Sequence, residues 1–91
     1  MVDSKHFVYM LKCNDGSYYM GYATDAHRRL REHNGELANK GAKYTRGRRP
    51  VKLVYFEACE SRSDALKREN ALRKLTRLQK EQLAQAFNLG D

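Results

Sequence analysis

Three runs along the chain concentrate apolar, β-branched and aromatic residues in short stretches that are typical of β-strands. FVYMLKC predicts a strand over about residues 6–13, and YYMGY predicts a second over residues 18–22. VKLVYFEAC, at residues 51–59, is the clearest of the three. Its alternation assigns two sets of side chains to opposite faces of a strand, namely Val51, Leu53 and Tyr55 on one face and Lys52, Val54 and Phe56 on the other.

The sequence NDGS, which links the first two runs, allows two kinds of hairpin turn. A two-residue turn at Asp15 and Gly16 would direct Tyr9 and Tyr19 to opposite faces of the sheet. A three-residue type I turn, closed by a left-handed Gly16, instead pairs Leu11 with Tyr19. Asn and Asp before Gly favour the three-residue form, so we expect Tyr9 and Tyr19 to share a face as diagonal neighbours.

Helical periodicity and capping residues predict three helices. Thr24 suits the N-cap of a helix that extends to about Asn34. Two later capping patterns, SRSD and TRLQ, open helices over about residues 62–75 and 77–88, and Gly90 stops the last one. A basic segment that contains glycines is expected to form a loop between the first helix and the third strand.

The predicted order of elements is ββαβαα, which indicates a small α+β domain with a three-stranded antiparallel sheet flanked by helices. The chain has 91 residues, enough for one modest core, so we interpret residues 1–91 as one domain with its core at about 6–80. No run is apolar enough to span a bilayer, and the N-terminus does not resemble a secretory signal. We therefore expect a cytoplasmic protein with no membrane partner.

The net charge of +7 is concentrated in one segment of the chain. Nine of the 18 lysines and arginines lie between Ala26 and Lys52, together with only two acidic residues, so this segment carries the whole excess. Such a localised positive potential favours a polyanionic partner, and nucleic acid fits it best. An anionic membrane is the competing partner, but the segment lacks the large apolar face of an interfacial helix.

Two charged residues fall among apolar helical positions. Glu69 lies three residues after Leu66 and three before Leu72, in the middle of a stripe predicted to be buried, and Arg29 lies beside the stripe of the first helix. An Arg29–Glu69 ion pair at the edge of the core is the explanation that chemistry alone favours. A hydrolytic site is the other, in which the arginine binds phosphate, the carboxylate holds a divalent cation and a phenol transfers a proton. A phenol is a weak base near neutral pH unless nearby cations lower its pKa.

These residues and their spacing resemble the GIY-YIG endonuclease superfamily. FVY and YMG stand at its two name-giving motifs, and ten-residue steps lead from Tyr9 to Tyr19 and on to Arg29, as in the N-terminal nuclease of the repair protein UvrC. Glu69, in ALKREN, stands where the family has its single metal-binding glutamate. GAKYTRGRRPVKLVY and SDALKREN resemble the small stand-alone bacterial members, and the resemblance covers about residues 7–80.

The resemblance implies hydrolysis of a DNA phosphodiester at one divalent cation, Mg²⁺ or Mn²⁺. Glu69 would ligate the cation and Arg29 would stabilise the phosphorane-like transition state. Tyr9 and Tyr19 would activate or orient the attacking water, and the pattern of the repair nuclease favours Tyr19 as the base. The expected function is a metal-dependent DNA endonuclease of repair or recombination, with no sequence-recognition domain attached. The alternative is a catalytically weak nucleic-acid-binding module that retains the fold.

Several further residues complete the predicted site. Gly21 belongs to the second motif, and His33 would either contact phosphate or complete the first helix. The basic segment is expected to bind DNA mainly through phosphates, with Tyr44 as a stacking surface for an unpaired base and a repair protein as a further, unidentified partner. The residues predicted to contact DNA are Arg28, Lys40, Lys43, Tyr44, Arg46, Arg48 and Arg49.

Overall fold

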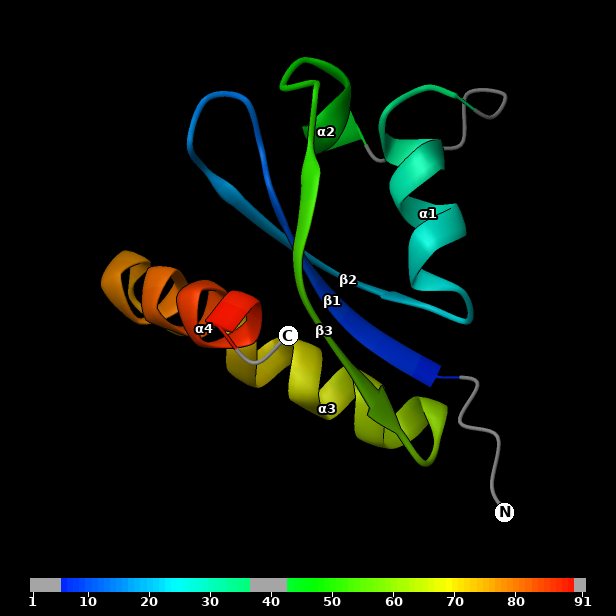
Figure 1. The fold of residues 1–91 in the computed structure, drawn as a ribbon. Coiled ribbons are helices and arrows are strands. Elements are labelled where there is room, and N and C mark those ends of the chain that lie inside the picture. Colours follow the sequence, from blue (N-terminus) through cyan, green and yellow to red (C-terminus); the bar gives the residue numbers. More distant parts are fainter. Residues whose placement is uncertain (1–5, 37–42, 90–91) are drawn as a thin grey trace.

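The computed structural model describes residues 6–36 and 43–89. Its elements are β1 (His6–Lys12), β2 (Tyr18–Ala23), α1 (Ala26–His33), α2 (Lys43–Arg46), β3 (Lys52–Cys59), α3 (Arg62–Arg73) and α4 (Arg77–Leu89) (Figure 1). The strands form one antiparallel sheet in the order β2-β1-β3, which confirms the predicted α+β class. The short helix α2 lies in the segment predicted to be a loop and is an addition to the predicted order.

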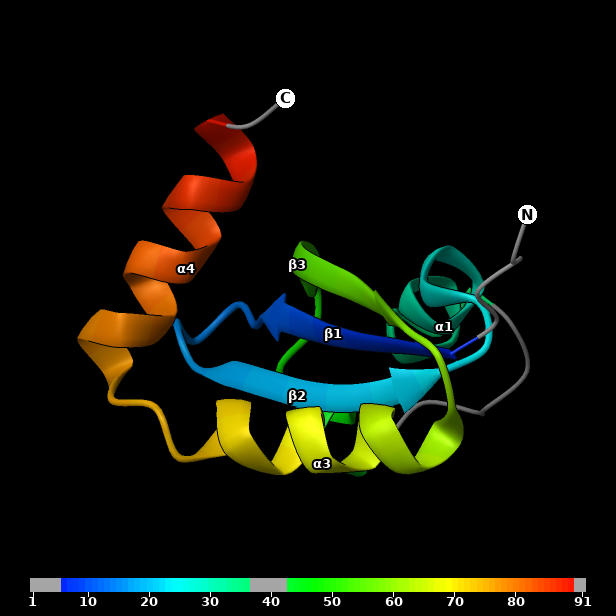
Figure 2. The same cartoon turned by 90° about the horizontal axis from the view of Figure 1, so that it is seen from below.

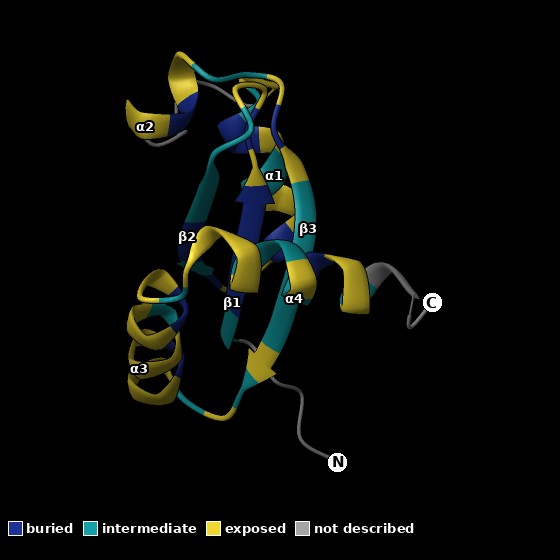
Figure 3. Ribbon diagram, turned by 90° about the vertical axis from the view of Figure 1, so that its left-hand side faces the viewer, coloured by how far each residue is buried: buried dark blue, intermediate teal, exposed yellow. Residues whose placement is uncertain are grey.

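The sheet separates two apolar clusters, because alternate side chains of β1 point to opposite faces. Val8 and Met10 pack with Ala65 and Leu72 of α3. Tyr9 and Leu11 belong to the other cluster, on the face that α1 covers. Figure 2 shows α3 and α1 on opposite sides of the sheet, and Figure 3 shows β1 buried along most of its length.

The hairpin between β1 and β2 has the predicted three-residue turn. Gly16 has a φ of 86°, and its N–H donates to the Cys13 carbonyl at 2.9 Å. Leu11 is paired with Tyr19 in the resulting register. Tyr9 and Tyr19 therefore lie on the same face of the sheet, as predicted.

The predicted alternation of β3 is wrong beyond Leu53. The register against β1 shifts between Met10 and Leu11, so that Tyr55 pairs with Met10 and Leu53 pairs with Leu11, leaving one extra residue in β3. This irregularity places Leu53 with Phe56 in one cluster, whereas Tyr55 packs in the other. A bulge reverses the faces in this way because side chains alternate with a period of two.

The helix caps agree with the sequence at two of three positions. Ser61 accepts from the Asp64 N–H at 3.1 Å, and Thr76 and Gln79 form a reciprocal capping box. The predicted N-cap Thr24 is wrong: Asp25 has extended backbone angles and accepts from the Arg28 N–H at 3.0 Å. A carboxylate at this position also interacts favourably with the helix dipole.

The helices end close to their predicted limits. α3 stops at Arg73, and α4 extends to Leu89, while the predicted stop at Gly90 lies outside the described residues. Within the described ranges, no helix combines the length and apolar character needed to cross a bilayer.

Candidate active site

Tyr9 lies in the middle of β1, opposite Gly21 of β2. Its ring crosses directly over this glycine, because a Cβ built on Gly21 would overlap the Tyr9 hydroxyl and ring. Gly21 thus acts through its missing side chain, which leaves space for the tyrosine above β2. Only glycine at position 21 allows the Tyr9 ring to approach β2 so closely, which explains why Tyr9 and Gly21 occur together in the two motifs.

Replacing Gly21 by Ala is expected to destabilise the fold by about 1–3 kcal/mol, because the buried Tyr9 ring has to move. Gly47→Ala is the matched control, since a Cβ there meets nothing within 4 Å. Urea unfolding of both variants measures the difference. Equal stability of the two variants would contradict the close packing of Tyr9 on Gly21.

The Tyr9 hydroxyl lies in a buried polar network. It hydrogen-bonds to Nε2 of His33 at 2.8 Å, and Nδ1 of His33 hydrogen-bonds to Oγ1 of Thr45, also at 2.8 Å. Burial raises the pKa of Tyr9, and the hydrogen bond and charge of Arg29 lower it only in part. Burial and the charge of Arg29 lower the pKa of His33 to about 4, so this imidazole is neutral at neutral pH.

The other three residues predicted to form the site all affect the ionisation of the Tyr9 hydroxyl. The hydrogen bond and charge of Arg29 on α1 lower the pKa of Tyr9, and the charges of Tyr19 on β2 and Glu69 on α3 raise it. The Tyr19 ring also packs edge-on against His33, with ring centroids 5.2 Å apart. Two strands and two helices therefore contribute to one site.

Arg29 is held by an acidic neighbour that the sequence analysis did not single out. Its Nη1 donates to Oε1 of the buried Glu32 at 2.9 Å, and Arg28 Nε lies 3.8 Å from the other carboxylate oxygen. Partial burial lowers the pKa of Arg29, but its hydrogen bonds to Glu32 and Tyr9 outweigh this effect and raise the pKa above its usual value. Arg29 therefore remains a cation at any pH at which the fold is stable.

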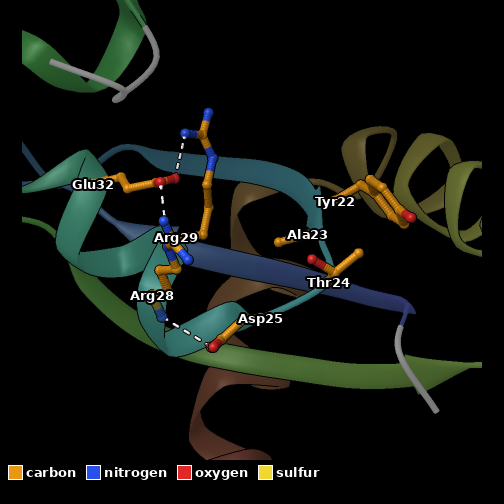
Figure 4. A pocket seen from close by; sticks show the side chains of 7 residues that line it. All are labelled: Tyr22, Ala23, Thr24, Asp25, Arg28, Arg29 and Glu32. Carbon is orange, nitrogen blue, oxygen red and sulfur yellow. Dashed lines mark hydrogen bonds and ion pairs between the residues drawn. The ribbon is translucent and has the colours of Figure 1, made fainter. Parts of the chain in front are cut away.

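These arginines line a polar pocket of about 340 Å³ beside the Tyr9 hydroxyl network. Figure 4 shows the Glu32 carboxylate between the two guanidinium groups, with the end of β2 opposite them. The pocket contains two guanidinium groups and two carboxylates, the buried Glu32 and the exposed Asp25, so its formal charges balance. Its lining residues are Tyr22, Ala23, Thr24, Asp25, Arg28, Arg29 and Glu32.

Glu69 differs from its predicted surroundings in two respects. Leu66 is 43% exposed, and Ala65 and Leu72 form the buried side of α3 instead, because the helix packs closely on the sheet through its small residue. The Glu69 carboxylate pairs with Arg73 at 2.6 Å, one turn further along α3. The expected Arg29–Glu69 ion pair is therefore replaced by two separate pairs, each within its own helix.

Glu69 has properties that fit the divalent cation implied by the resemblance. Its side chain is 13% exposed, and its charge contributes to raising the pKa of Tyr9. Among the described residues, no group of three or more His, Cys, Asp or Glu side chains could enclose a metal ion. A single carboxylate suits Mg²⁺, which commonly retains several waters and binds substrate phosphates.

The residues predicted to contact DNA divide into two groups. Arg28, Lys43, Tyr44 and Arg46 are exposed. Arg48 and Arg49 are half-buried and bind protein groups: Arg48 pairs with Asp15 at 2.9 Å, and Arg49 Nε donates to the His33 carbonyl at 2.6 Å. Lys40 lies outside the described residues.

His33 completes the first helix, which is one of its two predicted roles, and its side chain has a further structural role. It is the last residue of α1, as expected, but its side chain is completely buried and links Tyr9 to Thr45, so it is shielded from an approaching phosphate. Glu32 could have been found from its helical spacing of three and four residues after the two arginines. Thr45 carries no such local signal, because its partner is 12 residues away in the sequence.

The fold and these residues agree with a known family. The family model described as the GIY-YIG catalytic domain matches residues 5–82, which include Tyr9, Tyr19, Arg29 and Glu69. The chain belongs to the GIY-YIG family. GIY-YIG domains form a nuclease family, and the matched region includes all four residues expected to form the site.

Relatives with similar GIY-YIG sequences are small proteins of comparable length. A UPF0213 protein of Haloquadratum walsbyi is 55% identical over 80 residues, which cover 88% of this chain and 86% of that protein. A solution NMR structure of an E. faecalis protein is 50% identical with a TM-score of 0.60, covering 96% of this chain and 90% of that one. A UPF0213 protein of Bacillus halodurans, also solved by NMR, is 47% identical with a TM-score of 0.54, covering 89% and 83%.

Proposed function

We propose that the protein is a divalent-metal-dependent DNA endonuclease that hydrolyses phosphodiester bonds in repair or recombination. The observation that carries this proposal is that the charges of Arg29, Tyr19 and Glu69 all act on one buried phenol, that of Tyr9. A cation for phosphate, a carboxylate for a metal and two phenols are the groups that such a hydrolysis requires.

The two tyrosines differ in burial, which supports different roles for them. Tyr9 is 1% exposed and its hydroxyl is bound to His33, so we assign it to holding Arg29 in place. Tyr19 is half-buried and its ring stands at the edge of the site, so its hydroxyl is the one that a water molecule can reach. We therefore assign Tyr19 as the group that accepts a proton from the attacking water.

Glu69 is the proposed ligand of Mg²⁺ or Mn²⁺. When bound, the cation would neutralise phosphate charge as a Lewis acid and favour the phenolate form of a neighbouring tyrosine. Arg29 would bind a non-bridging phosphate oxygen, where its guanidinium stabilises the charge of the transition state. Glu32 keeps the Arg29 guanidinium in place by accepting a hydrogen bond from its Nη1.

DNA is the proposed partner, and it would be bound mainly through its phosphates. The helices α1 and α2 carry exposed basic residues and pack on the face of the sheet that carries the two tyrosines. Phosphate contacts of this kind give strong salt dependence and little sequence preference. A repair protein that directs the enzyme to particular DNA structures is a second proposed partner.

The experiment that tests this function is a cleavage assay with end-labelled single-stranded, duplex, flapped and branched DNA. We expect nicked or shortened products with Mg²⁺ or Mn²⁺ and none with EDTA. Binding to the same DNAs at several salt concentrations is measured in parallel. Salt-dependent binding without cleavage of any DNA would favour the alternative function, a nucleic-acid-binding module that keeps the GIY-YIG fold.

The ion pair between Glu69 and Arg73 predicts a competition with the metal. Arg73→Gln removes a cation that lies 2.6 Å from the proposed ligand, so the affinity for Mn²⁺ is expected to rise about 2–5-fold, as removal of an exposed pair allows. Arg77→Gln is the control, because Arg77 forms a similar pair with Glu81 on α4. Titration calorimetry without DNA measures both, and an unchanged or weaker affinity in Arg73→Gln would contradict the assignment of Glu69.

A further inference from the structure

Three side chains from three elements form a buried hydrogen-bond chain behind the site. Tyr9 of β1 bonds to His33 of α1, which bonds to Thr45 of α2, with 2.8 Å between the heavy atoms at each step. Tyr9 is 1% exposed, and the other two side chains are fully buried. In this setting each proton of the chain has a defined place, because a misdirected donor would remain unsatisfied.

The direction of the chain follows from the chemistry of Arg29 at its outer end. A guanidinium only donates hydrogen bonds, so the Tyr9 oxygen has to accept where it meets Arg29. When the Tyr9 O–H is directed to Nε2 of His33, that ring nitrogen is the unprotonated one. The proton of the neutral imidazole would then be on Nδ1, where it can donate to Oγ1 of Thr45.

We propose that Thr45 is a positioning residue that fixes the Nδ1–H tautomer of His33 and thereby keeps the Tyr9 oxygen an acceptor for Arg29. With the opposite tautomer, the Nε2–H group would donate to Tyr9, and the phenolic proton would be free to turn toward the guanidinium. Two donors would then face each other at the point where Arg29 is held. The catalytic consequence rests on the proposed function, whereas the tautomer itself does not.

The short helix α2 is anchored in a way that suits this role. Arg48, just after α2, pairs with Asp15 in the β1–β2 turn, and its Nη1 donates to the Tyr44 carbonyl at 2.8 Å. The Asn14 N–H also donates to the Arg48 carbonyl at 2.9 Å. The Tyr44 ring stacks on Tyr19, with centroids 5.7 Å apart. α2 is therefore attached to the hairpin and contacts both tyrosines, one directly and one through His33.

The tautomer can be measured in the intact protein by ¹⁵N NMR of the histidine rings at neutral pH. His33 is neutral there, because burial and the charges of Arg29 and Arg49 lower its pKa to about 4 against the opposing charge of Glu32. We expect a protonated Nδ1 and an unprotonated Nε2 for His33 in the wild type. An Nε2–H tautomer in the wild type would overturn the proposal without reference to any activity.

Substitution of Thr45 tests its part in setting the tautomer. Thr45→Val removes the acceptor and is expected to shift His33 toward the Nε2–H form, whereas Thr45→Ser keeps the hydroxyl and the Nδ1–H form. Thr24→Val, at an exposed threonine, is the control. An unchanged tautomer in folded Thr45→Val would overturn the proposal. A shifted tautomer in Thr45→Ser would also overturn it, and this variant serves as the test if Thr45→Val does not fold.

If the protein cleaves DNA, Thr45→Val is expected to lower kcat about 10-fold with little change in KM, because the loss lies in the orientation of Arg29 and not in DNA binding. Thr45→Ser is expected to retain kcat. Absence of cleavage in the wild type would contradict the proposed function, while the NMR result would still decide the role of Thr45. A normal kcat in Thr45→Val would overturn the link from Thr45 to Arg29.

Discussion

Replacing Glu69 by Gln is expected to lower metal-dependent DNA cleavage by about 10³-fold or more. The amide keeps the size of the side chain but removes the charge that holds a divalent cation, and the cation supplies several kcal/mol of transition-state stabilisation. DNA binding without metal is expected to remain within about 2-fold, because phosphate affinity comes from the lysines and arginines. Single-turnover cleavage rates and binding titrations measure the two effects.

Glu57→Gln is the matched control for this substitution. Glu57 is also a partly exposed carboxylate that pairs with an arginine, Arg68, but it is the cross-strand partner of Val8, on the opposite face of the sheet from Tyr9. Its loss should leave cleavage close to the wild-type rate. Equal losses of cleavage in the two variants, or full activity in Glu69→Gln, would remove Glu69 from the site.

Replacing Tyr19 by Phe is expected to lower kcat by about 10²–10⁴-fold, the usual contribution of a proton-transferring group. The ring and its stacking on Tyr44 are retained, so the fold and DNA binding should change little. Tyr18→Phe is the control, since this neighbour on β2 packs in the cluster on the opposite face of the sheet. Quenched cleavage assays at saturating DNA concentrations give kcat for both variants.

Tyr9→Phe separates the two tyrosines. It removes the hydroxyl that holds Arg29, so the loss should be smaller than in Tyr19→Phe if the assignment of roles is correct. A larger loss in Tyr9→Phe than in Tyr19→Phe would reverse the assignment and make Tyr9 the proton acceptor.

The parts of the fold that depend on local chemistry could be predicted from the sequence. The three-residue turn follows from the Asn and Asp that precede Gly16, and it alone sets the register that brings Tyr9 and Tyr19 to one face. The capping boxes at Ser61 and Thr76 are equally local, and both form. The α+β class follows from the order of such elements.

Features that depend on packing between distant segments could not be predicted. The bulge that reverses the faces of the β3 side chains beyond Leu53 arises from the pairing of β3 with β1, which is more than 40 residues away in the sequence. The alternation of residues within β3 does not encode the register of this pairing. Leu66 is exposed because the small side chain of Ala65 allows α3 to approach the sheet. Tertiary packing commonly overrides local patterns in this way.

The candidate site was predictable in its members but not in its connections. Spacing and the resemblance identify Tyr9, Tyr19, Arg29 and Glu69, and the last three all act on the pKa of Tyr9. The partners that hold them escaped prediction, because a hydrogen bond between Thr45 and a histidine one element earlier has no periodic signature. The roles of the four residues stay predictions until activity is measured.

The central claim is that this site adds water to a DNA phosphodiester, and the incorporation of solvent oxygen tests it most directly. Cleavage of labelled DNA in H₂¹⁸O with Mn²⁺, followed by mass spectrometry of the new ends, should show one ¹⁸O in the new terminal phosphate formed by the wild type and none in the new hydroxyl end. Glu69→Gln should give no such product. Wild-type protein that binds the DNA but yields no metal-dependent, ¹⁸O-labelled end would contradict the account.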